Sequence, residues 1–421
     1  MKLAIALFVI TYILLISLGR WRPWIAAGSA VLFILLGILP IQDVFGAIDW
    51  NILMMLSGTM GTVALFIESK MPNRMADLIL SKTPNIMWAA VALSLFAGIV
   101  SAFVDNVATV LMIAPVGIAI AKRLNTSPVP LIISIAVSSN LQGAATLVGD
   151  TTSILLGGYA GMDFLDFIFM NGKPSIFWSV ELGAIVTIPV ILFLFRKERS
   201  PITHAEPTVV TDIFPTVLLV GSIVLLIVAS FIPEKPAVTN GIICLSIFAI
   251  GAVRSYIKNR NMDSVIEAIK QIDYETLILL AGLFLVIAGI TEAGVIDAIS
   301  NLFVKIGGGN LFLMYTLIVW GSVLFSAFID NIPYVATMLP VVTGIATLQG
   351  WDPYVLYFGL LVGSTLGGNL TPIGASANIA GIGILRREGY NVSTGDFMRI
   401  GVPFTLIAVI SGYLFCWLVW A

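Results

Sequence analysis

The stretch SAFVDNVATVLMIAPVG at residues 101–117 returns later in the chain as SAFIDNIPYVATMLPVV at residues 326–342. Eight of the 17 aligned positions are identical, and the two copies are 225 residues apart. The same shift aligns VSSNLQGAATLVG at 137–149 with VGSTLGGNLTPIG at 362–374, with six identities in 13 positions. A shift one residue shorter aligns IDWNIL with IDYETL, the latter at 272–277. A repeat whose spacing changes by only one residue over three segments indicates that the chain consists of two related halves.

The composition predicts that both halves lie in a lipid bilayer. Charged residues make up 10% of the 421 residues and apolar residues 59%, whereas a soluble domain has about 25% charged residues. The formal net charge is −2 and no segment is strongly basic, which argues against nucleic acid as a partner. Cys244 and Cys416 lie far apart inside apolar runs, so neither a disulfide framework nor a metal site is expected from them.

Long apolar runs predict ten membrane crossings, because a helix of about 20 residues crosses the hydrocarbon. The predicted crossings are 3–19, 24–40, 50–68, 129–160, 176–195, 214–232, 238–253, 275–292, 354–385 and 397–420.

Two further apolar regions, residues 86–121 and 310–346, each contain two shorter runs on either side of an Asp-Asn pair. At 1.5 Å per residue, such arms reach only about 24 Å. Each region is therefore predicted to be a re-entrant hairpin with the Asp-Asn pair at its tip. Polar backbone at such a tip is tolerated only where it is buried in protein or lines a wet cavity.

The predicted fold is an all-α polytopic membrane protein built from two inverted repeats. The first repeat covers residues 1–195, a cytoplasmic linker covers 196–213, and the second repeat covers 214–421. Each repeat holds five crossings, and an odd number inserts the second copy upside down relative to the first. One crossing in each repeat, at 129–160 and 354–385, is predicted to be discontinuous because glycine and polar residues interrupt it.

The distribution of basic residues predicts the orientation in the cell membrane. With the N-terminus outside, only Lys2, Lys173, Lys235 and Lys305 of the 21 Lys and Arg residues fall outside. The other 17, including Arg22, lie on the cytoplasmic side, as the positive-inside rule requires. Both termini are therefore predicted to lie outside and the linker inside.

Three aspartates stand at the predicted breaks: Asp105 and Asp330 at the hairpin tips and Asp150 in the first discontinuous helix. A carboxylate at membrane depth costs about 2.5–3.5 kcal/mol on insertion scales. One interpretation is that each aspartate caps the helix that follows it. Asn, Ser or Thr would cap with a smaller desolvation penalty, so the favoured interpretation is an oxygen-lined site for a small cation or a proton.

The candidate site consists of oxygen-bearing side chains at the four breaks. These residues are Asp105, Asn106, Thr109, Asn140, Thr146, Asp150, Thr151, Thr152, Asp330, Asn331, Asn369, Thr371, Ser376 and Asn378.

At these residues the sequence resembles the ion transporter superfamily, in the branch of arsenite permeases, NhaD-type sodium/proton antiporters and the P protein. The resemblance is carried by the two hairpin motifs together with ATLVGDTTS and LGGNLTPIGASAN. It implies a homodimer and an elevator mechanism, in which a transport domain moves against a fixed scaffold. The corresponding residues of the antiporters bind ions, which implies Na⁺ ligands at Asp105, Asn106, Asp150 and Thr151.

The leading functional hypothesis is a secondary transporter that exchanges Na⁺ or Li⁺ for H⁺. The alternative is efflux of arsenite, antimonite or another small inorganic anion on the same fold. The dicarboxylate branch of the superfamily has Ser-Asn-Thr at both tips, so Asp-Asn at these positions argues against a dicarboxylate substrate. An intramembrane aspartyl protease usually shows Gly-x-Gly-Asp, which Leu147-Val148-Gly149-Asp150 lacks, and no enzymatic activity is expected. Na⁺ or H⁺ is expected as coupling ion, and no other cofactor.

Overall fold

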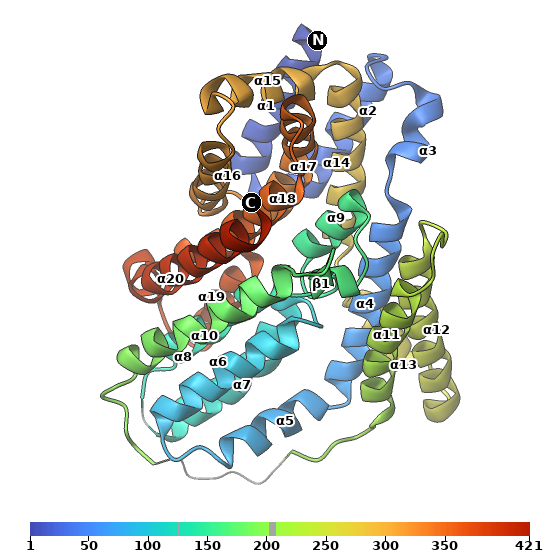
Figure 1. Cartoon of the computed structure of the whole chain (residues 1–421). Coiled ribbons are helices and arrows are strands. Elements are labelled where there is room, and N and C mark those ends of the chain that lie inside the picture. Colours follow the sequence, from blue (N-terminus) through green and yellow to red (C-terminus); the bar gives the residue numbers. More distant parts are fainter. Residues whose placement is uncertain (125, 202–207) are drawn as a thin grey trace.

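The structure is a computed structural model that describes residues 1–124, 126–201 and 208–421. Helices build almost all of it (Figure 1). The first part of the chain forms α1 (Lys2–Ser17), α2 (Arg22–Leu35), α3 (Val44–Ala47), α4 (Trp50–Glu68), α5 (Met71–Leu80), α6 (Ile86–Ser101), α7 (Asn106–Arg123), α8 (Val129–Gly143), α9 (Thr151–Ala160) and α10 (Ile176–Leu194), with the 3-10 turns Gly19–Trp21, Ile41–Asp43 and Leu165–Phe167.

The second part repeats this order of long and short helices. It forms α11 (Phe214–Ser230), α12 (Thr239–Asn259), α13 (Asp263–Lys270), α14 (Tyr274–Glu292), α15 (Val295–Gly307), α16 (Leu311–Ser326), α17 (Asn331–Gln349), α18 (Tyr354–Leu361), the π-helical turn Val362–Leu366, the 3-10 turn Gly368–Leu370, α19 (Ser376–Arg387) and α20 (Thr394–Trp420).

Each part of the chain packs one helix closely against a helix of the other part. Helix α12 packs along α4, and α2 packs along α14. A Cβ atom at Gly58 of α4 would lie 2.3 Å from the backbone of Cys244, and one at Gly282 of α14 would lie 2.6 Å from the backbone of Ala26. Glycine at both crossings lets the backbones touch, as at many helix contacts in membranes.

The number of helices that can cross a membrane is smaller than predicted. Among the described helices, seven are long and apolar enough, or up to nine if each of two bent pairs forms one span. The sequence predicted ten. Helices α1 and α2 have 16 and 14 residues and meet at 116°, so α2 extends only about 21 Å. The turn at Gly19–Trp21, followed by Pro23, separates them and prevents one continuous helix.

The predicted hairpins correspond to α6 with α7 and to α16 with α17, but their second arms are longer than expected. Helix α7 ends at Arg123 rather than at residue 121, because Lys122 and Arg123 continue it with basic side chains that suit a helix C-terminus. Helix α17 ends at Gln349 rather than at residue 346, where Gly350 adopts a φ of +68° and stops the helix. Both arms are therefore long enough to count among the candidate spans.

Several elements were not predicted, among them the four-residue helix α3 between two predicted crossings. The helices α5 and α15 fall between predicted segments, each directly before a hairpin. A two-stranded antiparallel sheet, β1 (Phe169–Met170) and β2 (Lys173–Pro174), interrupts the all-α fold. Its turn is Asn171-Gly172, with φ values of 52° and 74°, as the tight turn of a β-hairpin requires. In the linker predicted at 196–213, residues 202–207 lie outside the described part of the chain.

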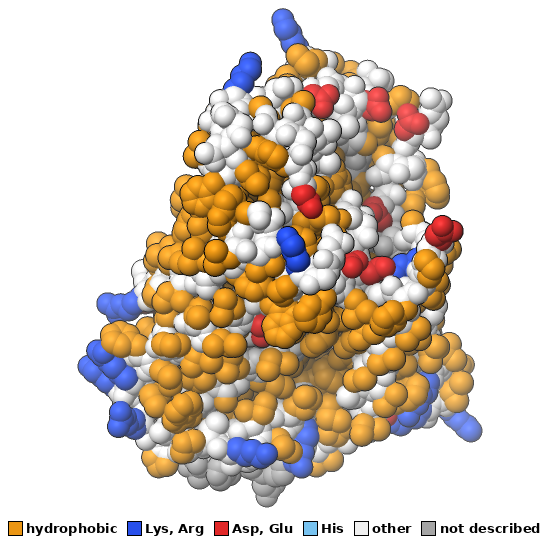
Figure 2. Space-filling model, in the orientation of Figure 1, with side chains coloured by type: hydrophobic (Ala, Val, Ile, Leu, Met, Phe, Trp, Pro, Cys, Tyr) orange, Lys and Arg blue, Asp and Glu red, His pale blue; other side chains and the backbone are white. Residues whose placement is uncertain are grey.

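Much of the molecular surface is apolar. On the face shown in Figure 2, hydrophobic side chains form a broad band, and most of the Lys and Arg side chains lie along its lower edge. Large apolar side chains are widely exposed, including Leu35 at 76% and Leu418 at 79% of their surface. Exposure on this scale is expected where lipid rather than water covers the surface.

Candidate functional site

Both hairpin tips use an aspartate to begin their second helix. The Asp105 Oδ2 atom accepts hydrogen bonds from the backbone N–H groups of Val107 at 3.0 Å and Ala108 at 3.1 Å. Asp330 Oδ1 accepts one from Ile332 at 3.1 Å. The capping interpretation therefore holds for both residues. Both bonds to Asp105 use the same oxygen, and among the described residues no donor reaches its Oδ1 atom.

A threonine fastens each discontinuous helix to the neighbouring hairpin tip. Thr146 Oγ1 donates to the carbonyl oxygen of Ala102, and Thr371 Oγ1 donates to that of Ala327. These two pairs are the same positions in the 225-residue repeat. The threonines therefore hold the breaks in place, and their hydroxyl protons are used by the protein itself.

Glycine is required where the same breaks meet the tips. A Cβ atom at Gly149 would lie 2.6 Å from the carbonyl oxygen of Ser101, and one at Gly374 would lie 2.6 Å from that of Ser326. Backbone oxygens at that distance leave no room for a side chain. The two breaks thus pack against their hairpins in the same way.

An amide network joins the discontinuous helices of the two halves. Asn140 Nδ2 donates to Asn369 Oδ1 at 3.1 Å and to the carbonyl of Thr365 at 2.7 Å. Asn106 Nδ2 donates to Asn140 Oδ1 at 3.1 Å, and the hydroxyls of Thr152 and Thr365 are 2.9 Å apart. All five residues are buried. Their side chains are directed to one another, so this centre ties the two breaks together.

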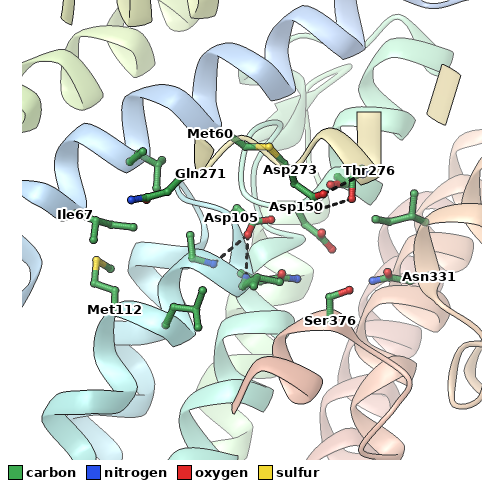
Figure 3. Close-up of a pocket in the computed structure, with 18 residues that line it drawn as sticks. Met60, Ile67, Asp105, Met112, Asp150, Gln271, Asp273, Thr276, Asn331 and Ser376 are labelled. Atoms are coloured by element: carbon green, nitrogen blue, oxygen red, sulfur yellow. Dashed lines mark hydrogen bonds between the residues drawn. The ribbon is translucent and has the colours of Figure 1, made fainter. Parts of the chain in front are cut away.

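A cavity of about 500 Å³ opens beside this centre. Figure 3 shows the carboxylates of Asp105, Asp150 and Asp273 around it. Asp150 is buried, with 4% of its surface exposed, whereas Asp105 is half-buried and Asp273 is exposed. The carboxylates therefore form a series that runs from the surface, at Asp273, into the interior, at Asp150.

Among the described residues that line this cavity, none is Lys, Arg or His. The remaining lining side chains are amides, hydroxyls and apolar residues, most of the apolar ones from α4 and α7, such as Met60 and Met112. No three His, Cys, Asp or Glu side chains in the described ranges come close enough to hold a metal ion together. A cation bound here would thus use amide, hydroxyl or backbone oxygens besides a carboxylate, a mixed set that hard cations accept.

The structure separates the fourteen candidate residues into two groups. The residues that line the cavity are Asp105, Asn106, Asp150, Thr151, Asn331 and Ser376. The residues that do not line it are Thr109, Asn140, Thr146, Thr152, Asp330, Asn369, Thr371 and Asn378. Members of the second group bond within the protein; Asn378 Nδ2, for example, donates to the carbonyl of Gly368 at 3.2 Å.

Asp330 differs from the other two aspartates because it has a basic partner. Arg22 Nη1 lies 3.0 Å from Asp330 Oδ2. Arg22 is predicted on the cytoplasmic side from the count of basic residues, and the sharp bend between α1 and α2 brings it to the second hairpin tip. The positive-inside rule counts basic residues in loops, so it does not reveal a bend that turns one of them toward the protein interior.

Three polar residues that line the cavity were not predicted from the sequence: Gln271, Asp273 and Thr276. Asp273 caps α14 through a 3.0 Å hydrogen bond from the backbone of Thr276. One signal was available, because the aligned segments IDWNIL and IDYETL place an aspartate at this position in both halves. Its proximity to the first hairpin depends on the packing of the two halves and is not visible in the sequence.

Comparisons with known proteins agree with this fold. A family model described as a citrate transporter matches residues 12–363. An uncharacterized transporter of Mycobacterium tuberculosis is 30% identical over 434 residues, which covers 99% of this chain and 98% of the relative. The P protein of Homo sapiens is 25% identical over 446 residues, covering 87% of this chain and 53% of that protein. The predicted resemblance to the ion transporter superfamily is confirmed.

Two solved structures share the fold at low sequence identity. The YdaH transporter of Alcanivorax borkumensis has a TM-score of 0.61 and 13% identity, over 89% of this chain and 86% of that chain. MtrF of Neisseria gonorrhoeae has a TM-score of 0.58 and 16% identity, over 90% and 83%. The architecture of α1–α20 is therefore one that occurs in membrane transporters.

Proposed function

This chain belongs to the citrate transporter family of the ion transporter superfamily and is a membrane transporter, and from that premise we propose that it exchanges Na⁺ or Li⁺ for H⁺. Asp105 and Asp150 are the shared ligands in this proposal. A proton leaves a carboxyl group when the metal cation binds, and it returns when the cation is released. The exchange therefore needs no other cofactor.

The observation that carries the proposal is the charge of the cavity. Two carboxylates at membrane depth, Asp105 and Asp150, face it, and no described lining residue supplies a positive charge. An ionised carboxylate in such surroundings is stable only with a counter-ion or a proton. A mobile cation and a proton are then alternative occupants of one site, which is the requirement for exchange.

The oxygen atoms around the two carboxylates suit a small hard cation. Asn106 and Thr151 line the cavity next to them and complete the proposed ligand set. The Oδ1 atom of Asp105 faces no donor among the described residues, so it is available to a cation. Hard cations such as these bind carboxylate, amide and hydroxyl oxygens.

The proposed transport cycle is an elevator movement between two inverted repeats, residues 1–195 and 214–421. The matching order of α1–α10 and α11–α20 and the matched seating of the two breaks support a duplicated fold. In inverted-repeat transporters, discontinuous helices of the two halves form the site near the midplane. We propose a homodimer in the cell membrane, with both termini outside and the linker at 196–213 inside.

In the proposed orientation, the structure is in the inward-facing state, with its cavity open to the cytoplasm. The exposed polar residues of the cavity lining are Gln271 and Asp273, which follow directly after the basic segment 254–270. The positive-inside rule assigns that segment to the cytoplasm. The cytoplasmic proton and cation concentrations would then set the occupancy of Asp105 and Asp150 in this state.

The family name raises citrate as another substrate, and the cavity argues against a free tricarboxylate. Citrate would meet Asp105, Asp150 and Asp273 without a basic side chain among the described lining residues. Like charges at short range repel, and more strongly in a partly desolvated site. Arsenite is the second candidate that the cavity supports, because neutral As(OH)₃ would meet hydroxyl and amide groups at Thr151, Ser376 and Asn331 without repulsion.

Proton flux in liposomes tests the proposal. The purified protein is reconstituted with an internal pH indicator, a pH gradient is imposed, and NaCl, LiCl, KCl, citrate or arsenite is added in separate runs. Na⁺ and Li⁺ should dissipate the gradient, whereas K⁺ should not. The proposal is wrong if Na⁺ and Li⁺ leave the gradient unchanged from mildly acidic to alkaline pH while arsenite or citrate accumulates in the vesicles.

A further inference from the structure

The carboxylate of Asp330 already has a cation beside it. Arg22 Nη1 donates to Asp330 Oδ2 at 3.0 Å, and the two side chains have only 19% and 11% of their surface exposed. Ser376 Oγ donates to the same oxygen at 3.5 Å. The negative charge of this hairpin tip is therefore balanced by a residue of the protein.

Further contacts hold Arg22 at this position. Its Nε atom donates to the carbonyl of Leu15 at 3.0 Å, next to the bend between α1 and α2. The hydroxyl of Tyr12 donates to the carbonyl of Pro333 at 2.9 Å and also contacts the hydroxyl of Thr337. The contacts of Tyr12 join α1 to the first turns of α17, the helix that Asp330 caps. Arg22 is thus part of the second tip and not a mobile surface side chain.

The first hairpin tip has no equivalent of this arginine among the described residues that line its cavity. Arg22 lies four residues before the α2 residue that packs on Gly282, and Asn240 lies four residues before the α12 residue that packs on Gly58. Because these two helix crossings correspond in the repeat, the position of Arg22 is held by a neutral amide in the other half. The Asp105 tip is left without an internal cation among the described lining residues.

The two halves also differ in the number of acidic residues at their breaks, and the first half has more. The 225-residue shift pairs Asp105 with Asp330, but it pairs Asp150 with Ala375. The first tip and its break thus have two carboxylates and no basic side chain among the described lining residues, whereas the second tip has one carboxylate, paired with Arg22 of the first half. Of the three aspartates at the described breaks, Asp105 and Asp150 are therefore the two whose charge a cation from solution would balance.

We propose that the guanidinium of Arg22 is a tethered cation that permanently fills the second of two duplicated cation sites, so that the transported cation binds only in the first half. This inference rests on the proposed exchange of Na⁺ at Asp105 and Asp150. Arg22 acts on Na⁺ transport by setting how many cations bind. It makes no contact with the transported ion.

The test is the Na⁺ dependence of proton exchange and of thermal unfolding, measured on the full chain and its variants. The wild type should respond with a Hill coefficient of about 1, and Arg22→Gln should raise it towards about 2, because Asp330 then needs a cation from solution. Thermal unfolding of Arg22→Gln should also depend more steeply on Na⁺, since a ligand stabilises the folded state that binds it.

Three variants make the result specific. Arg22→Gln combined with Asp330→Asn should return the response to one site, and it should fold because both charges of the pair are removed. Arg22→Lys should keep the one-site response, since it retains the positive charge. Arg20→Gln changes an exposed arginine next to the same bend and serves as the matched control.

The outcomes separate this inference from the proposed function. A wild type without any Na⁺ response overturns the proposed exchange. A wild type with a Na⁺ response that is identical in Arg22→Gln overturns only the tethered cation. If Arg22→Gln does not fold, the double variant decides. Loss of its Na⁺ response would show that the Arg22–Asp330 pair belongs to the transported-ion site, which also contradicts the inference.

Discussion

The two hairpin tips have the same Asp-Asn pair and the same helix cap, but their carboxylates have different neighbours. Asp105 faces a cavity of about 500 Å³ that it shares with Asp150, and no described lining residue is basic. Asp330 is 3.0 Å from Arg22 and does not line that cavity. Helix capping is a local property, so both copies of the motif retain it. The partner of each carboxylate depends on distant helices, and there the two copies differ.

This difference divides the roles of the three membrane aspartates. Removing one partner of a largely buried ion pair is strongly unfavourable, because it leaves the other charge unpaired, and the Arg22 and Asp330 side chains are only 19% and 11% exposed. Asp330 and Arg22 therefore serve the structure of the second tip. Asp105 and Asp150 lack such a partner and are left to bind an ion or a proton.

Neutralising the aspartates of the first half should have the largest effect. Asp105→Asn and Asp150→Asn should each lower Na⁺-driven proton flux about 100-fold or more, roughly 3 kcal/mol, because the cation loses a charged ligand. Folding should persist, since Asn caps a helix as well as Asp does at position 105, and the side chain of Asp150 makes no capping hydrogen bond. Flux in liposomes measures the effect, and Asp297→Asn, which changes an exposed acid on α15, is the control. Retained exchange in both variants would contradict the ligand assignment.

A methyl group added at the first break should destabilise the protein about as much as one added at the second break. Gly149→Ala and Gly374→Ala each place a Cβ atom 2.5 Å from a backbone oxygen, and such overpacking typically costs about 1–3 kcal/mol. Both variants should lower the thermal unfolding midpoint in detergent. Gly221→Ala on α11, where no atom lies within 4 Å of the new Cβ, is the matched control. If only one of the two variants kept the wild-type unfolding midpoint, the two breaks would not pack against their hairpins in the same way.

Asp273 and Asp49 offer a smaller test of the difference between the halves. Both cap a helix through a 3.0 Å hydrogen bond, at Thr276 and Ile52 respectively, but only Asp273 lines the cavity with Asp105. Asp273→Asn should raise the Na⁺ concentration for half-maximal exchange about 3- to 10-fold through the loss of roughly 1 kcal/mol of attraction. Asp49→Asn should leave it unchanged. Equal shifts in the two variants would mean that the effect is general and not due to the cavity.

The smallest effect is expected at a carboxylate outside the membrane. Burial raises the pKa of Asp212, but hydrogen bonds from Arg254 and Lys258 outweigh it and hold the pKa below its ordinary value. Because the pKa is lower in the folded state, the stabilisation is present above about pH 4 and is lost as the pH falls. Asp212→Asn should cost less than about 1 kcal/mol at neutral pH and weaken the acid dependence of the unfolding midpoint. An unchanged acid dependence would contradict this assignment.

Part of the fold was predictable because it depends on local sequence. Length and composition of the apolar runs predicted a membrane protein, and the repeated motifs predicted two hairpins whose tips lie at Asp105 and Asp330. Features that depend on only a few residues were harder to predict from the sequence. The end of α17 depends on the left-handed backbone of Gly350, and the separation of α1 from α2 depends on a turn of a few residues. Hydropathy averaged over about 20 residues does not resolve such features.

The sequence by itself determined that the protein lies in a bilayer, that it has two related halves, and which residue types stand at the breaks. Each of these follows from composition or from neighbouring residues. Tertiary structure alone decided which of those residues share a cavity. It brought Asp273 to the same cavity as Asp105 and Asp150, and it brought Arg22 to Asp330 across 308 positions of the chain. The physical reason is that electrostatic interaction depends on distance in space and on burial. Neither is encoded in the spacing of residues along the chain.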